Sequence, residues 1–240
     1  MDAGQITSDA LKYPSTDFKK ILILGILFIL SSLLIPGFLV LGYFFKSVKF
    51  SQAGSSELPD FNEWIPMFVD GLKVFVVLFV YSLVPGILIL LGVWAALLPM
   101  LTVPGEGSLL NPSISMQLVS GIALIGIALQ VVVSFVIPIA LTNMAHQDSL
   151  KVAFKFGEIY NIIRRIGGVD YLIWYIIMLI IVWAAYFISS FLIFPFLIGI
   201  IIVPLIIMPY LTLFIARSVA LLFNSQESGH EYYRHNKQVK

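Results

Sequence analysis

The stretch ILILGILFILSSLLIPGFLVLGYFF, residues 21–45, decides how this chain is organised, because it is apolar almost throughout and is interrupted by Pro36 and Gly37. A transmembrane helix needs about 20 apolar residues to cross about 30 Å of hydrocarbon. The pair Pro36-Gly37 is expected to end or kink a helix, because proline lacks an N–H group and clashes with the preceding turn. The stretch therefore either crosses a bilayer once or forms a hairpin of two short arms.

The composition of the whole chain indicates that its solvent is lipid. Of the 240 residues, 60% are hydrophobic and 11% are charged, and the mean hydropathy is +1.01. Soluble domains are about half apolar and about one quarter charged. The sequence therefore predicts an integral membrane protein. The chain has no cysteine, which excludes disulfides and thiolate ligands, and its net charge of +1 favours no nucleic-acid partner.

Three further apolar runs are long enough to cross a bilayer, at residues 74–103, 114–145 and 171–216. The first two of these are joined by PGEGSLLNPS, residues 104–113, whose glycines and prolines are typical of a turn. They are expected to form a helical hairpin. The third run is long enough for two passes, and its bend is expected near Pro195, within SSFLIFPFLIG.

Basic residues favour the hairpin for residues 21–45. A hairpin places all fourteen lysines and arginines on one side, whereas a single crossing leaves Lys12, Lys19 and Lys20 opposite the rest. Against it, residues 21–35 reach only about 22 Å as a helix. We predict an all-α polytopic membrane protein of three helical hairpins, hence six membrane helices with the first pair short, in one domain at residues 1–223. A polar, flexible tail follows at 224–240, and both termini are cytoplasmic at the cell membrane.

Two stretches between the runs are amphipathic. In LPDFNEWIPMFVDGLK, residues 58–73, and HQDSLKVAFKFGEIYNIIRRIGG, residues 146–168, apolar side chains recur at spacings of three and four. We expect both to be helices in the cytoplasmic interface. They either attract anionic lipid or only set how the hairpins enter the bilayer. Their candidate contacts to anionic lipid headgroups are Trp64, Lys151, Lys155, Arg164 and Arg165.

The order of these segments resembles a known family. The chain carries LKYPSTDFKKILILG, PGFLVLGYFFKSVK, LPDFNEWIPMFVDGLKVFVVLFVYSLVPGILI and AFKFGEIYNIIRRIG in that order. It is similar over residues 10–223 to the domain-of-unknown-function 4013 family of archaeal and bacterial multi-pass membrane proteins. The resemblance implies a fold and a membrane location. It implies no activity, substrate or catalytic residue.

The long apolar runs carry few groups capable of chemistry. Between residues 74 and 145 no side chain is charged except Glu106, which falls in the turn, and residues 171–216 carry no charged side chain. Their absence disfavours a proton relay or an ion-coupled site within the bilayer. One run carries uncharged polar residues that either bond a neighbouring helix or line a narrow polar path, namely Gln130, Ser134, Thr142 and Asn143.

The sequence predicts no catalytic, cofactor-binding or metal-binding residue. The segment HEYYRH, residues 230–235, fails the zinc-protease spacing because its second histidine comes one residue too late to share a helix face. We expect a non-enzymatic protein that organises the membrane or binds a partner. The alternative is a small transporter or channel for a neutral or lipidic solute. The expected partners are the bilayer, anionic headgroups, and a protein partner or a second copy of the chain.

Overall fold

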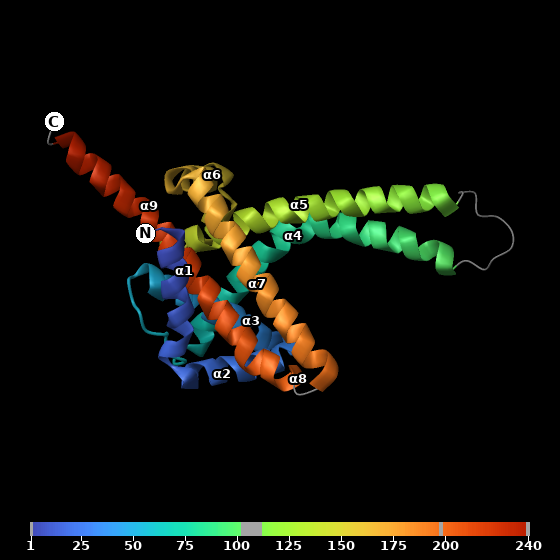
Figure 1. Cartoon of the computed structure of the whole chain (residues 1–240), viewed down its shortest axis with the longest axis horizontal. Helices are drawn as coiled ribbons and strands as arrows, with labels where there is room; N and C mark the ends of the chain where they lie inside the picture. The colour runs from blue at the N-terminus through green and yellow to red at the C-terminus, as the bar shows by residue number, and fades with distance from the viewer. Residues whose placement is uncertain (1, 102–111, 197–198, 239–240) are drawn as a thin grey trace. The chain divides into compact units, whose positions relative to one another are not determined.

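The computed structural model describes residues 2–101, 112–196 and 199–238. Most of these residues are helical, the connection at residues 53–63 is not, and none of them forms a strand (Figure 1). The predicted all-α class is therefore confirmed for this part of the chain. The elements are α1 Ala3–Lys12, η1 Tyr13–Thr16, α2 Phe18–Ile29, η2 Leu30–Ser32, α3 Leu34–Gln52, α4 Trp64–Leu101, α5 Pro112–Gln147, η3 Leu150–Phe154, α6 Phe156–Ile166, α7 Gly168–Phe196, α8 Gly199–Ile202, the π-helical η4 Val203–Ile207, and α9 Met208–Gln238.

Five of the described helices are long and apolar enough to cross a membrane. The candidate spans are Leu34–Gln52, Trp64–Ala95, Gly121–Gln147, Gly168–Ile193 and Gly199–Gln226. The helix α2 has 12 residues and is not among them. At 1.5 Å per residue it is about 18 Å long, well short of the hydrocarbon thickness of about 30 Å.

The chain divides into two compact units by its internal contacts. The first unit comprises residues 1–75 and 138–240, and the second comprises residues 76–137. The helix α9 belongs to the first unit and continues to Gln238, so it includes residues 224–238 that the sequence analysis assigned to a polar tail.

The first apolar run consists of two helices, α2 and α3, which contact each other. Asp17 begins α2, and its carboxylate accepts a hydrogen bond of 3.2 Å from the Lys20 N–H. The bend lies at Leu30–Ser32 and an extended Leu33, a few residues before the expected position. Pro36 is not at the bend because it occupies the first turn of α3, where an N–H group has no helical partner to lose.

The amphipathic stretch at residues 58–73 is not a separate interfacial helix, which corrects the sequence-based expectation. Residues 64–73 are the first turns of α4, which continues without a break. Pro66 is tolerated in the first turn. Gly71 costs a helix only about 1 kcal/mol relative to alanine and is too weak to end it.

The second amphipathic stretch is divided. A 3₁₀ helix, η3, is separated from α6 by Lys155, whose φ of −86° and ψ of 79° are not helical. The helix α6 ends at Gly167, whose φ of 105° lies in the left-handed region that glycine adopts without strain.

The expected turn at residues 104–113 falls mainly on residues 102–111, which are outside the described residues. Most of the expected bend at residues 189–199, including Pro195, lies within α7, and residues 197–198 are outside the described residues. On either side of residues 102–111 and 197–198, α4 ends at Leu101 and α5 begins at Pro112, while α7 ends at Phe196 and α8 begins at Gly199.

The core of the first unit forms where α1, α2, α3 and α9 meet. Its side chains include Tyr13, Ile21, Leu24, Leu27, Val40, Tyr43, Leu58, Met67 and Leu213. The helices α7 and α9 are also linked by a buried hydrogen bond of 2.8 Å from Trp174 Nε1 to Ser218 Oγ. In the second unit, α4 and α5 approach closely, since a Cβ atom at Gly92 would lie 2.7 Å from the Cβ of Ala123.

Candidate functional site

The connection between α3 and α4 is fixed by side chains that bind its main chain. Residues 55–60, which we call the clamped segment, present consecutive carbonyl oxygens to donors from η1, α2 and α3. Tyr13 Oη donates to Glu57 O at 3.2 Å, Lys20 Nζ to Leu58 O at 2.7 Å, Tyr43 Oη to Pro59 O at 2.9 Å, and Lys46 Nζ to Asp60 O at 3.0 Å. Burial raises the pKa of Tyr13, so its hydroxyl stays protonated and remains a donor.

The lysines of this region also form ion pairs. The pairs of what we call the charged layer are Lys20–Asp60 at 2.7 Å, Lys46–Glu63 at 3.0 Å, Lys49–Asp70 at 3.1 Å, Lys49–Asp148 at 2.7 Å and Lys73–Asp70 at 2.9 Å. The hydrogen bond from Lys20 lowers the pKa of Asp60, and that from Lys49 lowers the pKa of Asp148. Both carboxylates therefore stay ionised, which is characteristic of a layer in contact with water or headgroups.

Arg217 ties three parts of the first unit together. Its Nε lies 2.8 Å from Asp9 Oδ1 on α1, and its Nη1 donates to Ser55 O of the clamped segment at 2.6 Å. Its guanidinium also lies 5.2 Å from the centre of the Tyr13 ring. The residue is 6% exposed. The sequence analysis gave Arg217 no individual role. An arginine directly after a long apolar run indicates a charged group that needs a partner near the membrane boundary.

An apolar tip lies opposite the charged layer, where α2 turns into α3. Its side chains are exposed, namely Ile29, Leu30, Leu33, Leu34 and Ile35, with Leu34 79% exposed. At 1.5 Å per helical residue, the tip is about 15 Å from Lys20 along α2 and about 18 Å from Lys46 along α3. The tip therefore lies about half a hydrocarbon thickness away from the charges.

The basic residues that the sequence singled out on η3 and α6 are all exposed. Lys151, Lys155, Arg164 and Arg165 face outward, whereas Ile159 and Ile162 are buried against the unit. Lys155 pairs with Glu158 at 2.8 Å, and this hydrogen bond lowers the pKa of Glu158.

Aromatic residues share the exposed side of α6. Phe156 and Tyr160 are 64% and 66% exposed and lie four residues apart, with Arg164 four residues further on. Residues at this spacing occupy one side of a helix. We call residues 156, 160, 164 and 165 the outer face of α6.

Trp64 lies next to the charged layer and not on α6. It is the first residue of α4 and is 44% exposed. Its ring centre is 5.8 Å from that of Phe61, which stacks on Tyr43 at 4.1 Å. Trp64 therefore has one side against Phe61 and the other available to a headgroup layer.

The four polar residues of α5 are distributed over both units. Gln130 and Ser134 belong to the second unit, and Thr142 and Asn143, both buried, belong to the first. Ser134 Oγ donates to Val131 O at 2.8 Å, Thr142 Oγ1 to Pro138 O at 2.6 Å, and Asn143 Oδ1 accepts from Gln147 Nε2 at 3.1 Å. These bonds lie within α5. A bond to another helix runs from Gln52 Nε2 of α3 to Thr142 O at 3.1 Å.

Comparison with known proteins adds a family to this geometry. No curated protein and no solved structure matches the chain. A family model described as a protein of unknown function (DUF4013) matches residues 23–194. That range begins within α2 and ends within α7, so it contains the apolar tip, the clamped segment and α6. Because the match covers well over half of the 240 residues, the chain belongs to the DUF4013 family of proteins of unknown function.

Proposed function

We propose that this protein is a non-enzymatic membrane-organising protein that inserts the α2–α3 hairpin into one leaflet from the cytoplasmic side. The observation that carries the proposal is the distance of about 15–18 Å between the charged layer and the apolar tip. That distance matches one leaflet of a core about 30 Å thick. A hairpin anchored by ion pairs at the headgroups then ends near the bilayer midplane and adds volume to one leaflet only.

The hairpin is suited to this position because its backbone bonds are largely internal. An unpaired backbone N–H or C=O group is costly inside the hydrocarbon core. Because each helix pairs its own backbone groups, only the groups at the bend between α2 and α3 need other hydrogen-bond partners. At the bend the Ser31 hydroxyl donates to Phe28 O at 2.6 Å, and the Leu33 N–H donates to Leu30 O at 2.9 Å. The tip is thus able to present apolar side chains to the acyl chains.

The outer face of α6 supplies the second contact with the same headgroup layer. Arg164 and Arg165 are exposed there, and Lys151 and Lys155 are exposed just before α6. Each basic residue near an anionic surface contributes about 1 kcal/mol of attraction. Trp64 joins them from α4. In this arrangement the protein lies in the cell membrane as three hairpins, and both of its termini are on the cytoplasmic side.

Deformation of vesicles tests the proposal. Full-length protein is reconstituted in liposomes, and vesicle diameters are measured by electron microscopy. We expect wild-type protein to reduce the diameter or form tubules, and the double variant Leu34→Ser/Ile35→Ser to insert without doing so. The matched control is Val131→Ser/Val132→Ser, which changes two adjacent exposed apolar side chains of α5. Unchanged diameters with wild-type protein, or equal activity of the tip variant, would reject the proposal.

Cysteine accessibility tests the topology, because the chain has no native cysteine. We expect thiols introduced at Ser8 and Ser55 to react from the same side, and a thiol at Ser108, outside the described residues, to react from the other. Labelling of Ser8 and Ser108 from one side would contradict the three-hairpin arrangement.

The transporter alternative has less support. The Ser134 and Thr142 hydroxyls donate within α5, so they do not point to a continuous polar path along the helix. The non-enzymatic character rests on the sequence, since the long apolar runs carry no carboxylate or histidine placed for catalysis.

A further inference from the structure

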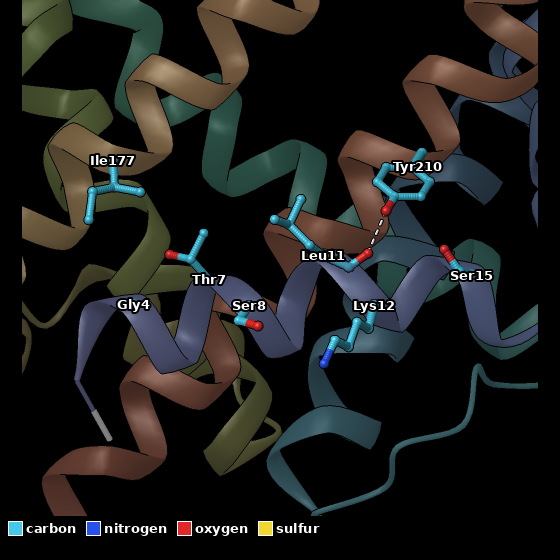
Figure 2. A pocket seen from close by; sticks show the side chains of 8 residues that line it. All are labelled: Gly4, Thr7, Ser8, Leu11, Lys12, Ser15, Ile177 and Tyr210. Atoms are coloured by element: carbon cyan, nitrogen blue, oxygen red, sulfur yellow. Dashed lines mark hydrogen bonds between the residues drawn. The ribbon is translucent and has the colours of Figure 1, made fainter.

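A groove lies along α1, away from the clamped segment and from α6. It has a volume of about 630 Å³ and opens to the surface. We call it the α1 groove, and it is lined by Gly4, Thr7, Ser8, Leu11, Lys12, Ser15, Ile177 and Tyr210 (Figure 2). Its volume is in the range of pockets that hold small ligands, about 300–1,000 Å³.

The wall formed by α1 and η1 has the chemistry of an anion site. Ser8 and Lys12 are exposed and lie four residues apart, which places them on one side of α1. Figure 2 shows the Lys12 ammonium and the Ser8 hydroxyl on the same side of α1. An ammonium beside hydroxyl donors binds phosphate oxygens by charge-assisted hydrogen bonds.

The charge of Lys12 is not neutralised within the described part of the protein. No carboxylate lines the groove, and no ion pair or hydrogen bond of the Lys12 side chain is found there. The nearest carboxylate along α1, Asp9, is held by Arg217 at 2.8 Å. A solute with a negative charge is therefore the complement of this wall.

The position of α1 is fixed by a contact between two residues that line the groove, Tyr210 and Leu11. Tyr210 Oη of α9 donates to Leu11 O, as the dashed line in Figure 2 shows. Ile6 and Ala10 are buried at 1% and 0% exposure beside this contact. Lys12 is thus displayed from a docked helix and not from a free terminus.

The other wall is apolar and belongs to α7. Ile177 lines the groove, and Ile173 and Ile180, on the same side of α7, are 46% and 63% exposed. The 29 residues of α7 are about 43 Å long, about 13 Å more than the hydrocarbon core. With that excess shared between its ends, Ile177 lies about 7 Å below the hydrocarbon boundary. Lys12 is then able to extend upward to the headgroups.

We infer that the α1 groove binds one anionic glycerophospholipid. The phosphodiester is held by Lys12 with the hydroxyl of Ser8, and an acyl chain follows Ile173, Ile177 and Ile180 along α7. The inference rests on the proposed membrane insertion of the first unit, but not on the deformation of vesicles.

Native mass spectrometry of the full chain in detergent tests the site. Protein is titrated with dioleoyl phosphatidylglycerol or dioleoyl phosphatidylcholine, and the fraction with one bound lipid is measured. We expect wild-type protein to prefer the anionic lipid, and Lys12→Ala to bind it about fivefold more weakly. Lys19→Ala, which removes an exposed lysine outside the groove, is the control and is expected to bind as wild type.

Further variants separate the headgroup from the acyl contact. Lys12→Arg is expected to retain binding, and Ile177→Trp, which fills the groove, is expected to weaken binding of both lipids. Glycerol 1-phosphate, which has the phosphate without acyl chains, is expected not to compete at equal concentration. Equal losses with Lys12→Ala and Lys19→Ala, or no preference for the anionic lipid, would overturn the inference. Lys12→Ala is also expected to deform vesicles normally, so failure here is distinct from failure of the proposed function.

Discussion

The α-carbon of Gly71 lies directly against the main-chain carbonyl oxygen of Phe38, and a Cβ atom at Gly71 would lie 1.8 Å from that oxygen. The relationship is reciprocal, because a Cβ atom at Gly42 would lie 1.8 Å from Met67 O. Where α3 and α4 meet, main chain therefore faces main chain, and neither helix has room for a side chain. This contact connects the α2–α3 hairpin to the first full-length apolar helix.

Replacing Gly71 by alanine is expected to lower the free energy of unfolding by about 1–3 kcal/mol or more, because the new methyl group overlaps with the backbone of α3. Unfolding in mixed detergent, followed by tryptophan fluorescence, measures the change. The control is Gly86→Ala in the same helix, where nothing lies within 4 Å of the added Cβ. It is expected to gain about 0.5–1 kcal/mol, because alanine is the better helix former. Equal stability of the two variants would show that the close approach does not exist.

Acid is expected to weaken the charged layer. The pKa of Asp60 is lower in the folded protein than the unfolded value of about 3.9, because Lys20 bonds the ionised form. The folded state thus binds fewer protons, and the contribution of this pair is complete above about pH 4 and is lost as the pH falls through the folded pKa. Thermal unfolding in detergent between pH 7 and pH 3 measures the loss.

The variant Asp60→Asn is expected to show a smaller fall in stability over the same pH range. Glu57→Gln is its control, because the Glu57 side chain makes no ion pair among the described residues. An identical pH profile for wild type and Asp60→Asn would contradict this role of the Lys20–Asp60 pair.

Loss of Arg217 is expected to release α1. Arg217→Met removes the partner of Asp9 and the donor to Ser55 O. The expected cost is about 1–3 kcal/mol, below that of a fully buried pair, because the Asp9 side chain is 42% exposed. Hydrogen exchange of residues 3–12 is expected to accelerate. The exposed Arg164→Met is the control and should leave exchange in α1 unchanged; similar acceleration in both variants would refute the assignment.

Ser218→Ala is expected to destabilise the α7–α9 pair by about 1–3 kcal/mol, because the buried Trp174 indole N–H loses its acceptor. Thermal unfolding in detergent and the tryptophan emission spectrum measure the effect. Thr212→Ala provides the comparison, since that hydroxyl donates to Met208 O within its own helix. A change in Ser218→Ala no larger than that in Thr212→Ala would mean that the bond contributes little.

The sequence predicted the helical class because apolar length is a strong signal. No charged side chain interrupts residues 74–101 or 171–196, and helices occupy both ranges. The bend of the first run was placed at Pro36 because proline is the obvious breaker there. Proline is also favoured in the first turn of a helix. When serines are nearby, a sequence pattern does not distinguish a proline at a bend from a proline in the first turn of the following helix.

The site was less predictable than the fold. The exposure of Arg164 and Arg165 follows from helical periodicity, which is local. Besides their carboxylate partners, Lys20 and Lys46 bind main-chain oxygens. Every residue carries such an oxygen, so no residue type in the sequence indicates these bonds. The α1 groove combines residues 4–15 with Ile177 and Tyr210, which only the tertiary structure brings together.

The clamped segment is important for the structure, yet its own side chains are expected to tolerate mutation. Its carbonyl oxygens do not depend on which side chain stands beside them, so an exposed position such as Glu57 will accept most replacements in a saturation-mutagenesis screen. Tyr13 and Tyr43, which supply the donors, will accept few. A screen confined to the connection would therefore find few sensitive positions. The side chains that fix its shape lie largely in the helices before it in the chain.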